Sequence, residues 1–271
     1  MGGSMPEWTI HTYTAAETGL FVNSYLLETP TGVAVIDTNL LVDDIEALRA
    51  RLKALRKPLR AIFVTHAHPD HFNGVSALVR DREVPVYALA PVAKVIRETA
   101  DAKRAQWGPI YGDQWPADTY YPNTELADGD QVDIDGITFT AHDLGPNESH
   151  ADSYFVADGR AFIGDLAFHG THPYTADGHT TDWLNTLERL EKELQGLRLL
   201  PGHGQPGGVE LLAEQRRYLL HYREVVRRLG TPLSDAAKAE LTAAMCRFQP
   251  DAPLSWLIAL GADAVAAEAN S

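Results

Sequence analysis

The feature that most constrains this chain is the run His66-Ala67-His68-Pro69-Asp70-His71, which begins at the end of an apolar stretch over 59–65. Four side chains that can bind a metal ion fall within six residues, and imidazole and carboxylate ligands suit Zn²⁺, Fe or Mn²⁺. Such a cluster is poorly solvated unless a cation neutralises it. The run therefore predicts a metal site first and hydrolytic chemistry second, with a surface histidine cluster as the disfavoured alternative.

The surroundings of this run predict an α/β arrangement. The short apolar stretch over 59–65 is typical of a buried strand, and a helical pattern over 42–55 precedes it. Alternating apolar residues predict earlier strands over 8–13, 20–27 and 33–37. The metal motif therefore follows the carboxyl end of a strand, which is where α/β sheets place their ligands.

The rest of the chain repeats this alternation. Further helices are expected over 72–80, 91–103, 182–194 (capped by Asp182), 209–229, 235–246 and 254–260. Further strands are expected over 84–89, 197–200 and in hairpins around Asp135-Gly136 and Asp158-Gly159. We expect one domain over 6–271 with a helical extension over 208–271, and residues 1–5 to be a residual tag before a native Met5.

The segment 106–126 is rich in aromatic residues, prolines and glycines, a mixture too broken for a helix and too aromatic for a linker. Two interpretations remain open. The rings could pack the loop onto the core, or the segment could form a lid or wall of an apolar substrate pocket.

Composition narrows the function. The 271 residues carry a formal net charge of −14, which disfavours nucleic acid and anionic membranes as partners. The arginines over 216–228 fit the solvated face of an amphipathic helix. The single cysteine, Cys246, excludes an internal disulfide, and no apolar run approaches the ~20 residues of a membrane helix. These features, with no secretory signal pattern at the start, predict a cytoplasmic protein.

Three motifs together resemble the metallo-β-lactamase superfamily of hydrolases. They are the His66–His71 run, Gly164-Asp165 and Pro201-Gly202-His203-Gly204, each placed after an expected strand. The resemblance covers roughly 20–204. It implies a four-layer αββα sandwich of two β-rich halves with helices outside, and a dinuclear metal site along one edge of the sheets.

The resemblance also implies a ligand set. His66 and His68 would bind the first metal, Asp70, His71 and His203 the second, and Asp165 would bridge both. Two divalent ions are implied, Zn²⁺ above all, with Mn²⁺ or Fe as alternatives. Asp70 would also orient the metal-bridging hydroxide, and Asp37 is either a partner of a ligating histidine or a cap at a strand end.

The chain departs from the family at the third ligand of the first metal. Counting back from the following strand places Glu148 where most members have histidine, as in the alkylsulfatase branch. His150 is the rival, because imidazole is the commoner partner of two histidines. Register favours Glu148, and in extended backbone both side chains would share a face and reach the metal.

The expected function is a dinuclear metal hydrolase of a small ester, lactone, thioester or sulfate-type substrate. A β-lactamase is the enzymatic alternative, and a metal-binding scaffold without turnover is the non-enzymatic one. The expected partner is a hydrophobic small molecule, which His172 could contact, and a homodimer could form.

Overall fold

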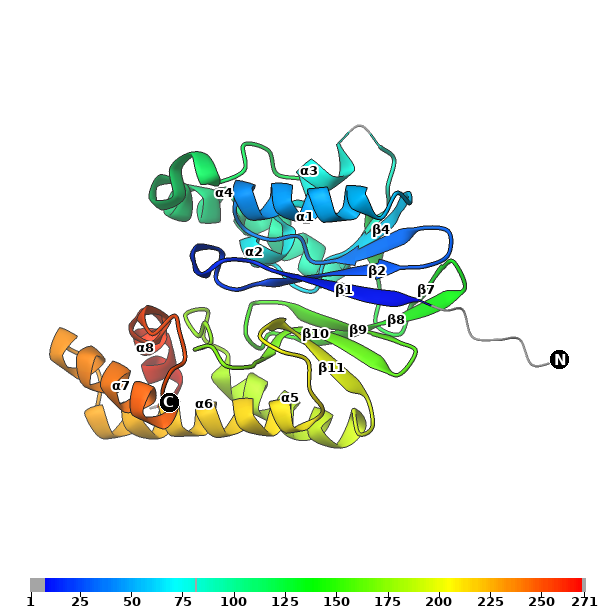
Figure 1. The fold of residues 1–271 in the computed structure, drawn as a ribbon. Coiled ribbons are helices and arrows are strands. Elements are labelled where there is room, and N and C mark those ends of the chain that lie inside the picture. The colour runs from blue at the N-terminus through cyan, green and yellow to red at the C-terminus, as the bar shows by residue number, and fades with distance from the viewer. Residues whose placement is uncertain (1–7, 81, 270–271) are drawn as a thin grey trace. The chain divides into compact units, whose positions relative to one another are not determined.

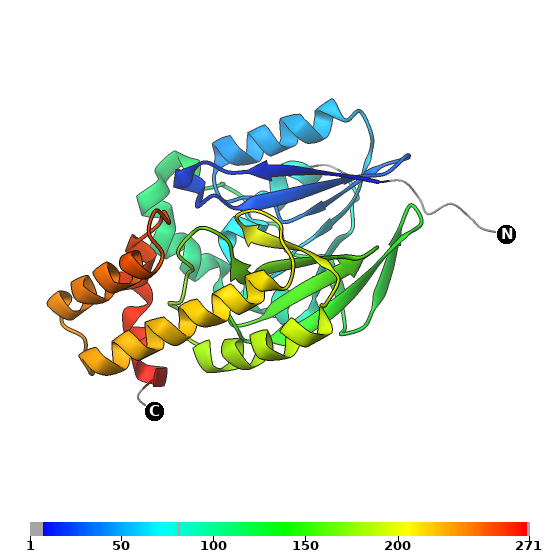
Figure 2. The same ribbon diagram turned by 60° about the horizontal axis from the view of Figure 1, so that its bottom comes forward.

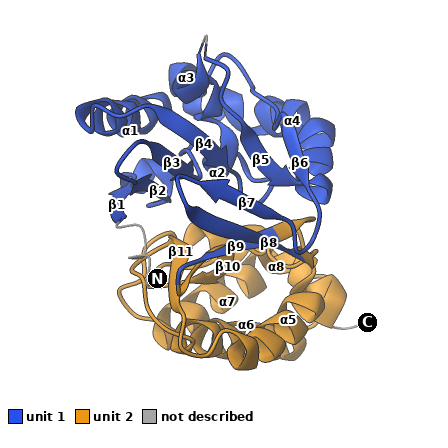
Figure 3. Cartoon of the chain, turned by 90° about the vertical axis from the view of Figure 1, so that its right-hand side faces the viewer, with its two compact units in different colours: residues 1–143, 153–158 blue, residues 144–152, 159–271 orange. Residues whose placement is uncertain are grey.

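The computed structural model describes residues 8–80 and 82–269, and it divides into two compact units (Figure 3). Unit 1 comprises Met1–Asp143 and Ser153–Asp158, and unit 2 comprises Leu144–Asp152 and Gly159–Ser271. The expected tag at residues 1–5 lies outside the described residues. The single domain over 6–271 stays a prediction.

Over the described residues, runs of strands are separated by helices, and three helices follow the last strand (Figure 1). The strands are β1 (Thr9–Thr14), β2 (Asn23–Glu28), β3 (Val33–Ile36), β4 (Leu59–Phe63), β5 (Val86–Leu89), β6 (Thr124–Leu126), β7 (Gln131–Ile134), β8 (Ile137–Gly145), β9 (Asp152–Ala157), β10 (Arg160–Phe168) and β11 (Arg198–His203). The helices are α1 (Val42–Ala54), α2 (Pro69–Phe72), α3 (Val75–Val79), α4 (Ala90–Tyr111), α5 (Thr180–Glu193), α6 (Glu210–Leu229), α7 (Asp235–Phe248) and α8 (Trp256–Ala269), with short 3₁₀ turns at Glu17–Gly19 and Gly112–Gln114.

The six-stranded sheet of unit 1 has the order β1-β2-β3-β4-β5-β6. Strands β1 to β3 pair antiparallel, whereas β3, β4, β5 and β6 pair parallel, with Val35 opposite Ile62 across β3 and β4. Because β3 and β4 run in the same direction, their carboxyl ends share one edge of the sheet. Asp37 and the His66–His71 run therefore start from the same edge.

One face of this sheet packs against β8 and β9. The buried Phe63 ring of β4 stacks on Tyr87 at 5.1 Å and on Phe139 at 4.9 Å, and meets Phe155 edge-on at 5.1 Å. Helices α1, α3 and α4 lie on the other face (Figure 1). The prediction of an α/β fold with two β-sheets and helices outside them is confirmed.

The five-stranded sheet has the order β11-β10-β9-β8-β7. Within unit 2, β10 and β11 pair parallel. Helices α5 and α6 attach to β10, since the Trp183 indole donates to the Leu166 carbonyl at 2.8 Å and the Phe168 amide donates to Gln215 at 3.2 Å. Helices α6, α7 and α8 lie side by side (Figure 2) and enclose their own apolar cluster. In the described part of the chain, no helix combines the length and hydropathy needed to cross a membrane.

Two helices differ from the expected bounds in unit 1. The helix expected over 72–80 breaks into α2 and α3, because the Gly74 amide donates to the Thr38 hydroxyl instead of continuing a helix. The segment 106–111, predicted to be too broken for a helix, completes α4. Pro109 removes only one backbone donor there, and Trp107 and Tyr111 pack against Leu40, Leu41 and Trp115.

In unit 2 the predicted Asp182 cap is wrong. Helix α5 starts at Thr180, and the Glu268 carboxylate of α8 accepts from the Thr180 amide at 2.6 Å and the Thr181 amide at 3.4 Å. Helix α8 itself continues well past the expected end at residue 260. The arginines of α6 do not form one solvated face either, because Arg223 is buried and donates to the hydroxyls of Thr180 and Thr181.

Candidate metal-binding site

The His66–His71 run forms a buried cluster in unit 1. All four metal-capable residues are at most 7% exposed. The ring centroid of His66 lies 4.0 Å from that of His71 and 5.0 Å from that of His68, and His71 Nε2 lies 3.5 Å from Asp70 Oδ2. Pro69 begins α2 directly after His68, so the backbone turns within the motif. An imidazole binds a metal through a nitrogen that carries no proton.

Hydrogen bonds to Asp37 and Thr65 assign the tautomers of two histidines. Asp37 Oδ2 lies 2.8 Å from His71 Nδ1, and Asp37 also accepts from the Thr65 amide at 2.9 Å and the Thr65 hydroxyl at 2.8 Å. The Thr65 hydroxyl, with its proton directed to Asp37, accepts from His66 Nδ1 at 3.0 Å. Both imidazoles therefore carry their proton on Nδ1 and a metal-binding lone pair on Nε2. Asp37 is thus both a histidine partner and a cap of the strand end.

Unit 2 holds the second group of acidic and imidazole side chains. Asp165 lies within β10 and His203 ends β11, and both side chains are 3% exposed. Their nearest atoms, Asp165 Oδ2 and His203 Nε2, are 3.2 Å apart, while the His203 ring stacks on Phe168 at 4.9 Å. Parallel pairing of β10 and β11 brings these two motifs together, as their positions after expected strands indicated.

The turn between β8 and β9 separates Glu148 from His150. The amides of Asn147 and Ser149 both donate to Asp152 Oδ2, at 3.2 and 2.9 Å, which coils the turn. Glu148 is completely buried, whereas the His150 side chain is 49% exposed. The expectation that both share one face is wrong, because the backbone over 146–151 is bent and not extended.

His172 lies in the interior of unit 2. Its ring is completely buried, with Nδ1 2.9 Å from the Tyr218 hydroxyl and Nε2 3.9 Å from Cys246 Sγ. Its amide donates to the Pro253 carbonyl at 3.2 Å. Burial lowers the pKa of this imidazole. These contacts give His172 a place in the packing of the C-terminal helices, and its contact with a substrate stays a prediction.

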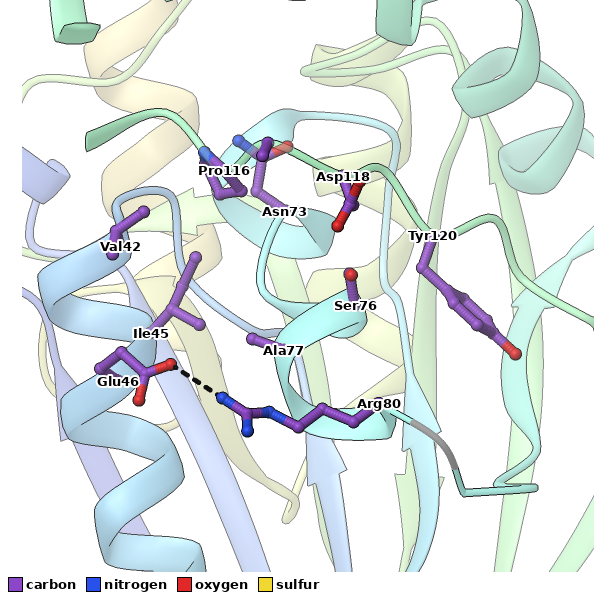
Figure 4. Close-up of a pocket in the computed structure, with 11 residues that line it drawn as sticks. Val42, Ile45, Glu46, Asn73, Ser76, Ala77, Arg80, Pro116, Asp118 and Tyr120 are labelled. Atoms are coloured by element: carbon purple, nitrogen blue, oxygen red, sulfur yellow. Dashed lines mark ion pairs between the residues drawn. The ribbon is translucent and has the colours of Figure 1, made fainter. Parts of the chain in front are cut away.

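A cavity of about 500 Å³ opens in unit 1 between α1, α3 and the segment 116–120 (Figure 4). None of the candidate metal ligands lines it. Its walls carry the ion pair of Arg80 and Glu46, with Nη2 and Oε1 3.6 Å apart, and the Asp118 carboxylate beside Ser76. Trp115 packs on the core, as the first interpretation of the aromatic segment expects, and residues 116–120 line this cavity. A role of the segment as the wall of a substrate pocket stays a prediction.

The protein has two β-sheets with outer helices, and it buries histidine and carboxylate groups suited to divalent metals. These features define its class as an α/β fold with a candidate metal centre. The family model of the metallo-beta-lactamase superfamily matches residues 18–203. The chain therefore belongs to the metallo-beta-lactamase superfamily.

Curated relatives and solved structures agree with this family. The linear primary-alkylsulfatase of Pseudomonas sp. (strain ATCC 19151) is 29% identical over 67% of this chain and 41% of its own length. The hydroxyacylglutathione hydrolase of Aeromonas hydrophila is 29% identical over 56% of this chain and 51% of its own length. The chain thus spans about half the length, or less, of these two relatives.

Among solved structures, the metallo-beta-lactamase family protein TTHA1429 from Thermus thermophilus aligns with a TM-score of 0.70 at 19% identity, covering 97% of this chain and 94% of that one. TTHA1623, solved in a di-iron-bound form, aligns with a TM-score of 0.61 at 28% identity, covering 77% of this chain and 99% of that one.

Proposed function

We propose that the chain is a dinuclear metal-dependent hydrolase of a small-molecule ester. His66, His68 and Glu148 would hold one divalent ion, and Asp70, His71 and His203 the other, with Asp165 between them. The observation that carries this proposal is the tautomer assignment, because Asp37 and Thr65 engage Nδ1 of His71 and His66 and so leave the metal-binding lone pair of each ring on Nε2. Buried carboxylates in the same sets would balance the cations.

The donor chemistry fits two borderline divalent cations. When bound, such a pair polarises the scissile bond and supplies nucleophilic water at neutral pH. Asp70, only 7% exposed, would orient the attacking water and hold its proton until the leaving group departs. Asp37 and Thr65 would keep the histidine rings in place throughout.

Glu148 supports a preference for harder metals and for sulfate-type esters. A carboxylate in place of a third histidine adds negative charge to the first metal group, which favours Mn²⁺ or Fe over Zn²⁺ alone. The similarity to TTHA1623, solved with two irons, and to an alkylsulfatase points the same way. We therefore rank a hydrophobic alkyl sulfate first, ahead of lactones and thioesters.

The basic residues of α6 do not favour a glutathione thioester. Arg216 is paired with Glu191 at 2.7 Å, Arg228 with Glu240 at 3.4 Å, and Arg223 is engaged with α5. These arginines already form ion pairs or hydrogen bonds within unit 2. They therefore do not provide a set of available positive charges for an anionic peptide.

The test is a hydrolysis panel with protein reconstituted separately with Zn²⁺, Mn²⁺ and Fe²⁺. The substrates are an alkyl sulfate, an aryl ester, an acyl lactone, a thioester, a phosphodiester and a β-lactam. We expect chelator-sensitive turnover of the alkyl sulfate that Asp70→Ala abolishes. Turnover of the β-lactam alone would make the protein a β-lactamase, and metal binding below two equivalents without turnover would indicate a scaffold.

A further inference from the structure

Unit 2 contains a second histidine cluster that the proposed reaction does not use. His150 Nδ1 lies 2.8 Å from His179 Nε2, with ring centroids 5.1 Å apart and the rings nearly perpendicular. On its other side, His150 Nε2 lies 3.8 Å from Asp177 Oδ2. The His150 side chain is 49% exposed, so the pair can be reached from solvent.

The Asp177 carboxylate orients the pair. It is held in place by the Tyr174 hydroxyl, which donates to Asp177 Oδ1 at 3.0 Å, and its side chain is only 10% exposed. A carboxylate beside Nε2 favours the proton on that nitrogen, so Nδ1 of His150 carries the lone pair that faces His179. In metal sites a carboxylate commonly accepts from the outer N–H of a ligating histidine, and Asp177 lies on that side of His150 at ion-pair distance.

The backbone turns His179 toward His150. Gly178 and His179 both adopt left-handed conformations, with φ of 84° and 63°, immediately before α5. A side chain other than glycine is uncommon in this region, and strain of this kind collects at binding and switch sites. This backbone conformation places the His179 imidazole next to His150.

We propose that His150 and His179 bind a single borderline divalent cation, such as Zn²⁺ or Cu²⁺, as a site additional to the dinuclear one. Without metal, His179 Nε2–H donates to His150 Nδ1. On binding, the proton of His179 moves to its own Nδ1, so two neutral nitrogens coordinate the ion, water completes the coordination, and no net proton is released. Asp177 acts as a positioning residue through His150.

The experiment counts Zn²⁺ equivalents by calorimetry on zinc-equilibrated, dialysed protein. His179→Asn is the main variant, because asparagine tolerates the left-handed backbone. His221→Asn on α6 is the matched control, since its ring meets only Glu224 and Phe248 among the described contacts of unit 2. We expect wild type and control to bind one weaker equivalent that His179→Asn and His150→Gln lose, while the tightly bound equivalents stay unchanged.

A second measurement separates positioning from ligation. Asp177→Asn should keep the weaker equivalent but bind it about tenfold less tightly. Copper added to the zinc-bound wild type should show two-nitrogen splitting in its electron paramagnetic resonance spectrum, and one or none in His179→Asn. Retention of the weaker equivalent in His179→Asn would overturn the proposal. Loss of a tightly bound equivalent in His150→Gln would overturn it too, and would make His150 a ligand of the main site. Neither result depends on hydrolytic activity, so failure here leaves the proposed function standing.

Discussion

Asp37 Oδ2 lies 2.8 Å from Nδ1 of His71, although the two residues are separated by α1 and β4 in the chain. Both side chains are buried, at 3% exposure for Asp37 and 0% for His71. The parallel pairing of β3 and β4 places Asp37 beside the strand end from which the motif begins. The His66–His71 run therefore depends on Asp37, a residue outside it, for the hydrogen bond that fixes the His71 ring.

Replacing Asp37 should weaken metal binding before it affects the fold. Asp37→Asn keeps the size of the side chain but loses the charge that fixes the His71 tautomer, so we expect metal affinity to fall about 10–100-fold. Competition with a fluorescent chelator measures this. Asp101→Asn, exposed on α4, is the control and should bind as wild type does. Equal affinities in both variants would show that Asp37 serves only the backbone of Thr65.

Glu148 and His150 should respond differently to substitution. Glu148→Gln removes a buried carboxylate from the proposed ligand set, and we expect one tightly bound metal equivalent and nearly all turnover to disappear. His150→Gln changes an exposed side chain and should retain both tight equivalents. Atomic absorption after dialysis provides the count. The reverse result would return the ligand role to His150.

The buried imidazole of His172 should make stability depend on pH. Burial lowers its pKa from 6.5, so the unfolded state binds more protons between the folded-state pKa and 6.5. Its full contribution to the free energy of unfolding is present above pH 6.5. It declines as pH falls through this window, by at most about 1.4 kcal/mol per unit.

Urea unfolding of wild type and His172→Asn at pH 7.5 and pH 5 tests this prediction. Asparagine can still form a hydrogen bond with the Tyr218 hydroxyl but does not titrate. The free energy of unfolding of the variant should therefore fall less than that of wild type over this range. Identical pH dependence in the two proteins would show that His172 protonates without cost.

Glu268 should contribute to stability as the cap of α5. Its carboxylate accepts from the amides of Thr180 and Thr181, so Glu268→Ala leaves those donors unsatisfied and should cost about 1–3 kcal/mol. Glu240→Ala, which removes an exposed partner of Arg228, should cost less than about 1 kcal/mol. Urea denaturation compares them, and equal losses would contradict the capping role.

Much of the fold follows from local patterns. The apolar stretch before His66 predicts β4, and the Asp135-Gly136 turn predicts the hairpin of β7 and β8, because side-chain periodicity and turn conformations act over a few residues. The residues that the three motifs single out as candidate ligands are buried, and their ligand role stays a prediction. The His66–His71 run follows β4, whereas Asp165 lies within β10 and His203 ends β11.

Other features were decided only by tertiary structure, since they depend on residues far apart in the chain. Helix α4 continues through Pro109 because Trp107 and Tyr111 pack against Leu40 and Leu41, and α5 begins at Thr180 because Glu268 accepts from it. Asp152, through two backbone amides, coils the turn that buries Glu148 and exposes His150. The sequence by itself determined the order of the motifs along the chain and the types of donor atom they carry. Tertiary contacts chose which donors face inward, because burial of a side chain depends on packing that no local pattern specifies.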